Sequence, residues 1–351
     1  MGVGIDGSNE QVARSARTLR IEAAQWRRVL AGYAQLSPGP SGSVEARLQA
    51  LHDAFAAEVP DASPLAGGAA ARTCPACLEG SIVRRYARAP GAGAQSPPLV
   101  YGRCGGCGHG LLLSTPEPDS LYRTAAYYER RTSSGAGYCG YEAERDYRVD
   151  KGRRLLRRIA MLFGRPPGSM LEIGSGFGFT RAAAASLGWK TMGIDPNPAA
   201  GAGAKRLFGM ETFVGTLSSA LDSGAVGHGV WDMVLYDFVL EHLADPEGEL
   251  RRAAGLLSPA GVLALVVPSM AAAEVEIFGG AYRSFRSDHR HIFSPDSLTL
   301  LLGRAGLSLA GTRSGCTLHL LKAVLTGGEL SQLYEDGRGP DLTVVARRPR
   351  H

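Results

Sequence analysis

A stretch near the middle of the chain combines acidic residues and glycines in an order suited to holding a nucleotide-like ligand. An apolar run at 169–173 includes Glu172, and a glycine then occurs at every second position from Gly174 to Gly178. Glycine has no Cβ and tolerates positive φ angles, so such a loop lets the backbone approach a ligand closely. The alanine-rich segment 181–187 predicts a helix, and the free N–H groups at its start favour a polar or anionic group.

A second acid follows at the spacing expected for a contact with ribose. Residues 189–194 predict another strand, which ends at Asp195. In nucleotide-binding βαβ units, an acid about 20 residues after the glycine loop meets the ribose hydroxyls. The alternative is a structural glycine turn followed by a solvent-facing aspartate. The order of strand, loop, helix and strand favours the ligand site over that alternative.

These motifs resemble those of class I S-adenosylmethionine-dependent methyltransferases. The chain shows Glu-x-Gly-x-Gly-x-Gly from 172, the acid at 195, and the sequence WDMVLYDFVLEHL at 231–243. A dinucleotide-binding dehydrogenase usually has a third glycine where this chain has Phe179. The resemblance covers roughly residues 145–351 and implies an α/β fold with a Rossmann-like sheet of seven strands, the last of them antiparallel.

The resemblance also implies S-adenosylmethionine as the cofactor, bound at the carboxyl ends of the parallel strands. The residues that it places there are Glu172, Gly174, Ser175, Gly176, Gly178, Asp195, Pro196, Tyr236, Asp237 and Phe238. Many members of the family have an acid after the third strand that contacts the adenine amine. Here Gly-Thr-Leu follows the strand predicted at 210–214, so the partner of the adenine amine is left open.

Two pairs of cysteines nearer the N-terminus have the spacing of a metal site. Cys74 and Cys77 form one Cys-x-x-Cys pair, and Cys104 and Cys107 form the other. Each pair can place two thiolates on one tight turn, and two turns complete a tetrahedral set of four sulfurs for Zn²⁺. Two local disulfides or a redox pair are the alternatives, and the lack of a secretory signal disfavours disulfides. Four protein ligands would fill the metal, so we expect a structural zinc.

A zinc ribbon ahead of a methyltransferase domain resembles a bacterial group that includes deoxysugar C-methyltransferases and related natural-product enzymes. In that group, a Pro-rich turn and a tyrosine-rich segment follow the ribbon, and the segment packs over the substrate pocket. This chain has prolines at 116 and 118, and the tyrosines that follow are Tyr122, Tyr127, Tyr128, Tyr138 and Tyr141. Tyrosine offers a ligand an apolar face and a polar tip. A packed helical linker is the alternative for any single tyrosine.

Histidines supply the candidate bases. An oxygen or acidic carbon acceptor gains from a base with a pKa near neutrality. His289 and His291 lie at the end of a long loop predicted from residue 270, which follows the fifth strand and is expected at the active edge of the sheet. Tyr282 in the same loop is a weaker candidate, and His242 after the fourth strand is another. For each histidine, a packing or capping role is the alternative.

The chain has 351 residues, enough for more than one domain, and its patterns divide it into four segments. These are an N-terminal helical extension and linker at 1–72, a zinc ribbon at 73–115, a tyrosine-rich linker with a basic helix at 116–165, and a Rossmann-like methyltransferase domain at 166–351. The extension has helices predicted at 12–36 and 44–57 and a linker at 59–71, which is too small a core to stand alone. We expect it to dock on the rest of the protein, on a second copy in a homodimer, or on a partner protein.

Composition and charge narrow the class of protein. No run approaches the ~20 apolar residues of a membrane span, and the N-terminus lacks the basic and apolar regions of a secretory signal. The formal net charge of +5 is mildly basic and does not demand a nucleic-acid partner. We therefore expect a cytoplasmic enzyme with a small-molecule substrate, no membrane contact and no nucleic-acid partner.

The leading hypothesis is methyl transfer to carbon or oxygen of a nucleotide sugar or a natural-product intermediate. The first alternative is an rRNA methyltransferase, since zinc ribbons also precede such enzymes. N-methylating nucleobase enzymes typically carry Asn/Asp-Pro-Pro-aromatic after the fourth strand, where this chain has Tyr236-Asp237-Phe238-Val239. The second alternative is a non-catalytic scaffold that binds the cofactor, and the intact glycine motif argues against it.

Overall fold

The computed structural model describes residues 9–19, 22–39, 42–59, 64–65, 73–88, 98–129, 136–164, 168–315, 321 and 324–349. These residues form two compact units. The ribbon unit comprises Met1–Thr115, Pro268–Pro295 and Arg313–Asp341. The sheet unit comprises Pro116–Val267, Asp296–Thr312 and Leu342–His351. Each unit is therefore assembled from segments that are distant in the sequence.

The sheet unit is built on a mixed sheet of seven strands in the order β11-β12-β9-β8-β5-β6-β7. The strands are β5 (Ser169–Ile173), β6 (Lys190–Asp195), β7 (Phe213–Val214), β8 (Trp231–Asp237), β9 (Leu257–Pro268), β11 (Ser308–Ser314) and β12 (Asp341–Arg347). The pairs β5–β6, β5–β8, β6–β7 and β8–β9 are parallel. Strands β11 and β12 are antiparallel, because Ser308 at the start of β11 forms a hydrogen bond with Arg347 at the end of β12, and Gly315 after β11 forms one with Asp341 at the start of β12. The sheet expected from the sequence is confirmed.

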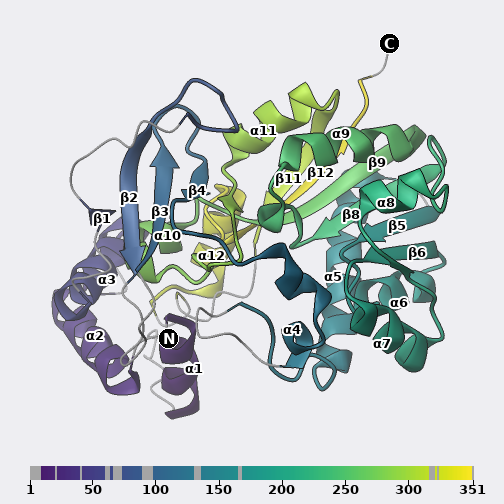
Figure 1. The fold of residues 1–351 in the computed structure, drawn as a ribbon. Helices are drawn as coiled ribbons and strands as arrows, with labels where there is room; N and C mark the ends of the chain where they lie inside the picture. The colour runs from purple at the N-terminus through teal and green to yellow at the C-terminus, as the bar shows by residue number, and fades with distance from the viewer. Residues whose placement is uncertain are drawn as a thin grey trace. The chain divides into compact units, whose positions relative to one another are not determined.

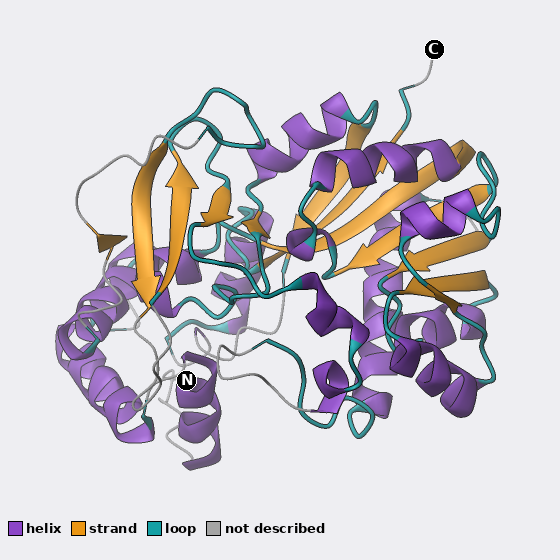
Figure 2. Cartoon of the chain, in the orientation of Figure 1, coloured by secondary structure: helices purple, strands orange, loops and turns teal. Residues whose placement is uncertain are grey.

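Helices cover both faces of this sheet, as Figure 2 shows. The helices of the sheet unit are η2 (Asp119–Arg123), α4 (Ala126–Glu129), α5 (Arg145–Phe163), α6 (Phe179–Ser186), α7 (Pro198–Phe208), α8 (Leu217–Asp222), η3 (Leu240–His242), α9 (Pro246–Leu256) and α11 (Pro295–Arg304). The apolar stripe of α5, with Leu155, Leu156 and Ile159, packs against Met170 of β5 and Met233 of β8. The charged face of α5 is left toward solvent, so this basic helix folds by burying one side.

The ribbon unit contains a sheet in the order β1-β2-β3-β4-β10. The first four of these strands are labelled in Figure 1. Its strands are β1 (Pro64–Leu65), β2 (Ile82–Arg88), β3 (Leu99–Cys104), β4 (Gly110–Leu112) and β10 (His291–Ile292). Its helices are α1 (Asn9–Leu19), α2 (Ala23–Leu36), α3 (Val44–Glu58), α10 (Ala273–Phe278), η4 (Gly279–Ala281) and α12 (Gly327–Glu335). The segment from 268 to 295 thus completes the ribbon sheet, because β10 pairs antiparallel with β4.

The N-terminal helices find their core inside this unit. Trp26 of α2 and Phe55 of α3 pack edge-on against Phe278 of α10. Residues of α12, including Leu330 and Leu333, belong to the same buried cluster. The apolar residues of these helices, too few for a core of their own, therefore share one with segments that lie more than 200 residues further along the chain.

Three local predictions need correction. The single helix expected at 12–36 is two helices, because Glu22 before α2 has an extended backbone, with φ −71° and ψ 146°. The third strand, expected at 210–214, is only two residues long. The long loop from residue 270 contains α10 and η4, which form where their apolar residues bury against α2 and α3. Most of the linker expected at 59–71 lies outside the described residues.

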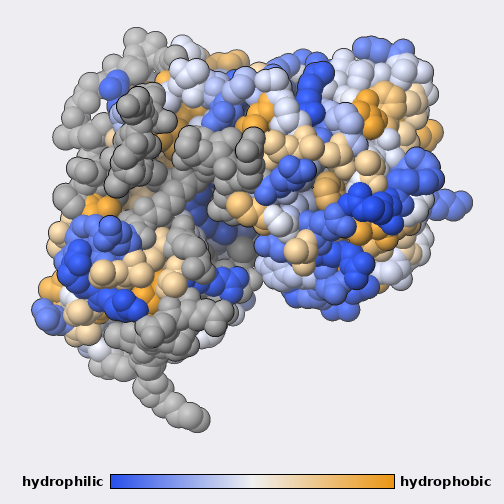
Figure 3. All heavy atoms as spheres, turned by 60° about the horizontal axis from the view of Figure 1, so that its bottom comes forward, coloured by the Kyte–Doolittle hydropathy of each residue, from blue (hydrophilic) through white to orange (hydrophobic). Residues whose placement is uncertain are grey.

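Within the described ranges, no helix combines the length and apolar character that crossing a membrane requires. On the face shown in Figure 3, hydrophobic residues are interspersed with hydrophilic ones.

Candidate functional site

The glycine loop of the sheet unit follows β5 and leads into α6. Gly174, Gly176 and Gly178 have φ angles of 67°, 50° and 79°, a region in which other residues are strained. A Cβ on Gly174 would lie 2.4 Å from Cγ2 of Val239, so the loop packs tightly against the turn after β8. The amide groups of Gly174 and Ser175 donate to the carbonyl of Ile194, which joins the loop to β6. These contacts hold the loop at the carboxyl edge of the sheet.

Asp195 closes β6 with its carboxylate turned to this loop. Its Oδ2 accepts hydrogen bonds from the N–H of Gly176 at 2.8 Å and the hydroxyl of Tyr128 at 3.3 Å. Its Oδ1 accepts from the N–H of Asn197 at 2.9 Å. Burial raises the pKa of Asp195 to about 6, although the N–H donors of Asn197 and Gly176 oppose the rise. The predicted ribose-binding acid is thus buried beside the predicted loop, with Pro196 next to it in the chain.

The tyrosine-rich segment packs on the glycine loop. Tyr128 and Tyr141 contact the ring of Phe177, with centroids 4.9 Å and 5.2 Å from it. A Cβ on Gly176 would lie 2.7 Å from the hydroxyl oxygen of Tyr141. Tyr138 lies against both tyrosines, and the guanidinium of Arg148 lies 4.0 Å from the centroid of the Tyr141 ring. The segment therefore forms an aromatic cover over the loop.

Two further acids of the site have oxygens without a hydrogen-bond donor among the described residues. They are Glu172 at Oε2 and Asp237 at Oδ1, and the buried hydroxyl of Ser175 also lacks a partner there. Burial, reinforced by the nearby Asp237 charge, raises the pKa of Glu172 to about 8. A ligand that brings a positive charge and N–H donors would satisfy these oxygens. The sulfonium and ammonium groups of S-adenosylmethionine have that chemistry, so the residues present fit this cofactor.

The turn after β8 carries backbone strain. Phe238 has φ 58°, a conformation that is unfavourable for a bulky residue and that concentrates at functional sites. The Nζ of Lys151 lies 4.7 Å from the centroid of the Phe238 ring and 3.9 Å from Oδ1 of Asp237. The hydroxyl of Tyr236 instead donates to Oε1 of Glu249 in α9 at 3.1 Å, and burial raises its pKa. Tyr236 therefore packs between sheet and helix, while Lys151 enters the site without any motif that would have indicated it.

His242 lies in the same unit as the glycine loop. It ends η3, directly after β8, and its Nδ1 lies 3.1 Å from the hydroxyl of Tyr122. The two rings meet edge to face at 5.3 Å, and Tyr122 in turn contacts Tyr127. His242 is thus connected to the aromatic cover of the loop.

The four predicted metal ligands come together in the ribbon unit. Their sulfurs all lie within 4.8 Å of one another, and the pairs Cys74–Cys107 and Cys77–Cys104 are each 3.6 Å apart. A zinc–sulfur bond of about 2.3 Å gives a tetrahedron with edges of about 3.8 Å. All four cysteines are free thiols, so the disulfide alternative is wrong. A Cβ on Gly80 would lie 2.3 Å from the Cys104 sulfur, which explains a glycine there.

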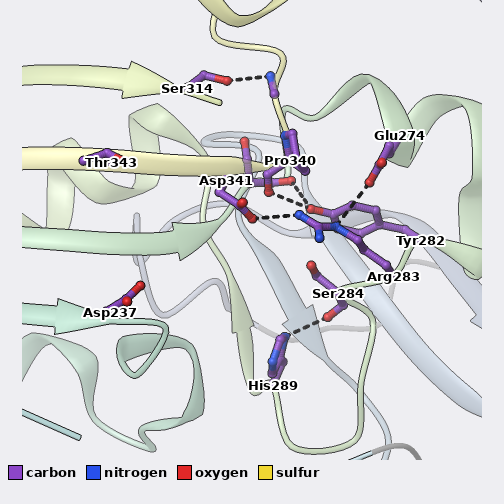
Figure 4. Close-up of polar contacts among 12 residues, drawn as sticks. Asp237, Glu274, Tyr282, Arg283, Ser284, His289, Ser314, Pro340, Asp341 and Thr343 are labelled. Atoms are coloured by element: carbon purple, nitrogen blue, oxygen red, sulfur yellow. Dashed lines mark hydrogen bonds and ion pairs between the residues drawn. The ribbon is translucent and has the colours of Figure 1, made fainter. Parts of the chain in front are cut away.

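The remaining predicted catalytic residues lie in the ribbon unit. Nδ1 of His289 is 2.9 Å from the carbonyl oxygen of Ser284, which only accepts (Figure 4). Nδ1 therefore carries a proton and donates it to this carbonyl. Nδ1 of His291 lies 3.0 Å from Nε2 of His109, and both rings are buried. Burial and the neighbouring His291 hold the pKa of His109 well below its usual range. No local signal in the sequence indicates this pair.

Tyr282 belongs to a buried polar network. Its hydroxyl lies 3.1 Å from the carbonyl of Ser269 and 3.0 Å from that of Pro340, and burial raises its pKa above the usual range. Next to it, Arg283 pairs with Asp341 at 3.1 Å and with Glu274 at 3.6 Å (Figure 4). A phenol that donates to backbone carbonyls joins segments of the unit, so Tyr282 is better explained by structure than by catalysis.

Comparisons with known proteins agree with the site in the sheet unit. Residues 141–310 match the family model of a methyltransferase domain. No protein of curated function matches the chain. Solved structures that are similar include an S-adenosylmethionine-dependent methyltransferase from Archaeoglobus fulgidus. The two chains are 16% identical, the match covers 59% of this chain and 99% of that one, and the TM-score is 0.45.

Two further similar structures come from other organisms. The 1,6-didemethyltoxoflavin-N1-methyltransferase of Burkholderia thailandensis is 19% identical over 60% of this chain and 84% of its own, with a TM-score of 0.41. The other is a complex of the Trm112 methyltransferase activator with a methyltransferase from Haloferax volcanii. It is 19% identical over 60% of this chain and 95% of its own, with a TM-score of 0.43. Likenesses at this level do not indicate a substrate. Residues 141–310 match a methyltransferase domain, and the protein is a methyltransferase.

Proposed function

We propose that the enzyme methylates oxygen or carbon of a small molecule, such as a nucleotide sugar or a natural-product intermediate. The observation that carries this proposal is the aromatic cover of the glycine loop, from which Tyr122 reaches His242. Tyrosine rings with a histidine between them suit an organic acceptor with polar groups, because they combine apolar contact with hydrogen bonding.

In this proposal the sheet unit holds the cofactor. Asp195 accepts hydrogen bonds from the ribose hydroxyls, while Glu172 and Asp237 face the cationic part. The glycine loop approaches through its backbone, and Phe238 packs beside it. S-adenosylmethionine supplies an activated methyl group, so these residues mainly align donor and acceptor for an in-line displacement.

We propose His242 as the first candidate for the base, and His289 as the second. His242 belongs to the same unit as the loop, and the contact with Tyr122 fixes its ring. His242→Ala should lower kcat at least tenfold and leave the affinity for S-adenosylhomocysteine unchanged. His52→Ala is a matched control, because His52 is a partly buried histidine that contacts the carbonyl of Ile277 in the ribbon unit. Full turnover of the His242 variant, with loss in His289→Ala, would move the assignment to His289.

The ribbon is proposed to hold one structural Zn²⁺ through Cys74, Cys77, Cys104 and Cys107. Amide groups support the thiolates: Gly80 donates to the Cys77 sulfur at 3.2 Å and Gly106 to the Cys104 sulfur at 3.3 Å. Burial opposes ionisation of Cys77, but the N–H donors of Glu79 and Gly80 bring its pKa down to about 7. Such a set of four sulfurs leaves no open position, so the metal would stabilise the fold and take no part in methyl transfer.

Methyl transfer from labelled S-adenosylmethionine tests the substrate class. The panel contains nucleotide sugars, natural-product intermediates and total bacterial RNA. Label on a small molecule supports the proposal and identifies the atom to map. Label on RNA alone overturns it. Cofactor binding without label on any acceptor would instead favour a cofactor-binding scaffold.

One observation favours RNA as a second candidate. Arg84 of β2 stands directly opposite Arg103 of β3, and like charges at such positions are destabilising. Neither arginine has an ion pair among the described residues. A phosphate backbone would offset that repulsion. If RNA is the substrate, Arg103→Gln should weaken RNA binding. It should also make the slope of log K against log salt concentration shallower by about 1, because one phosphate contact is lost.

A further inference from the structure

Tyr128 takes the position of a ligand at the predicted ribose-binding acid. Its hydroxyl donates to Oδ2 of Asp195, the same oxygen that the Gly176 amide binds. Oδ1 is engaged by the amide of Asn197. Both residues are buried: Asp195 is 4% exposed and Tyr128 is 8% exposed. The oxygens of Asp195 are therefore shared among donors of the chain itself.

We propose that the Tyr128 hydroxyl competes with the ribose hydroxyls of the cofactor for Asp195, so that cofactor binding displaces the α4 turn of the tyrosine-rich segment. The inference rests on the proposed cofactor site. A phenol O–H and a ribose O–H offer the same donor to a carboxylate, so the two exclude each other at Oδ2. The two amide donors can remain, because they come from the loop and from the strand end that the cofactor would use.

The packing around Tyr128 makes displacement a movement of a segment. Tyr128 contacts Phe177 and Tyr141, and the Tyr141 hydroxyl lies against Gly176. The amide of Tyr138 also donates to the carbonyl of Tyr127 at 2.8 Å, which ties the two parts of the segment together. A ligand that approaches the loop backbone at Gly176 therefore meets both tyrosines. Once released from Asp195, Tyr128 would be available to the methyl acceptor.

The test measures the affinity for S-adenosylhomocysteine by calorimetry in the full-length protein. Tyr128→Phe keeps the ring and removes the competing hydroxyl, so it should bind about three- to tenfold more tightly, the range that one net hydrogen bond supplies. Tyr147→Phe is the control. It removes a hydroxyl from an exposed tyrosine of α5 that lies outside the aromatic cover, and its affinity should equal that of the wild type.

A second readout follows the segment directly. Hydrogen exchange of the Tyr128 amide, which donates to the Ala125 carbonyl, should become faster when S-adenosylhomocysteine is added. Equal or weaker binding by Tyr128→Phe, or slower exchange in α4, would overturn the competition while the cofactor site stands. If the wild type and both variants fail to bind S-adenosylhomocysteine, the cofactor site itself is wrong, and the competition falls with it.

Discussion

Buried carboxylates are satisfied in different ways in the two units. In the ribbon unit they have arginine partners, although neither oxygen of Glu274 accepts a hydrogen bond among the described residues. Asp288 accepts two hydrogen bonds of 2.8 Å from Arg286, and Arg283 lies between Asp341 and Glu274. These acids join α10, the segment after it and the start of β12, and removing one partner would leave a buried charge.

In the sheet unit, the acids around the glycine loop have neutral donors or none. Asp195 is held by two amides and a phenol, and Oε2 of Glu172 has no donor among the described residues. Two cations lie nearby. Arg181 lowers the pKa of Glu172 and of Asp195 by its charge, but its guanidinium donates to the Glu211 carbonyl and the Thr212 hydroxyl. Lys151 comes only to 3.9 Å from Asp237. The difference separates structure from function: an acid with its own arginine stabilises the fold, whereas an acid without one is suited to a cationic ligand.

The cysteine cluster of the ribbon unit extends this comparison, because its sulfurs have no arginine partner among the described residues and would need a metal ion instead. The four sulfurs lie within 4.8 Å of one another, so as thiolates they would repel one another unless a cation such as Zn²⁺ held them together. Cys107→Ser should abolish the bound zinc and remove a large part of the roughly 10 kcal/mol that structural zinc contributes to small domains. Elemental analysis and thermal unfolding measure both effects. Cys139→Ser, at an exposed cysteine, should change neither. A wild-type protein that contains no zinc would refute the site.

The next largest effect concerns the approach of a ligand to the loop. Gly176→Val places a β-branched residue at φ 50° and a Cβ 2.7 Å from the Tyr141 hydroxyl, so affinity for S-adenosylhomocysteine should fall at least about a hundredfold. Gly209→Val is the control: its φ is 66° and nothing lies within 4 Å. It should cost about 1–2 kcal/mol of stability and leave the affinity unchanged. Similar affinities in the two variants would show that strain alone explains any loss.

The pH dependence of binding sharpens the comparison further. Glu172, with its pKa raised to about 8, is mostly neutral at pH 7, and a cationic ligand favours its ionised form. Binding should therefore release a proton, and affinity should rise with pH by up to about tenfold per unit until it levels off near pH 8. Calorimetry in buffers of different ionisation enthalpy counts the proton. In Glu172→Gln, the dependence above pH 6.5 should disappear. A flat wild-type profile would contradict the assignment.

Local patterns in the sequence were enough to predict the scaffold of both sites. The glycine loop, the acid at the end of β6 and the two Cys-x-x-Cys turns each lie within a few residues, and backbone chemistry dictates their residue types. The seven-stranded sheet followed from the resemblance that these motifs carry. The residues chosen for the cofactor and for catalysis stay predictions, as do the substrate, the partner and the cellular location.

Contacts between distant segments could not be predicted. Tyr128 meets Asp195 across 67 positions, and His109 meets His291 across 182. Nothing in the sequence near His289 and His291 indicates that the segment after β9 completes the ribbon sheet through β10. That pairing depends on tertiary packing, which single-sequence periodicity does not encode.

The smallest predicted effect tests the ribbon side of the comparison. Burial raises the pKa of Glu274 from 4.5 to about 7; Arg283 opposes the rise and Asp341 adds to it. The folded state then binds more protons than the unfolded state between those values, so the free energy of unfolding should fall as pH rises from 5 to 8. Glu274→Gln should remove about 2–3 kcal/mol of that fall, measured by urea unfolding at both pH values. Glu276→Gln, at an exposed acid of the same helix that pairs with Arg338, should keep the wild-type slope. An unchanged slope in Glu274→Gln would mean that Arg283 keeps Glu274 ionised throughout, which would make the contrast with Glu172 larger.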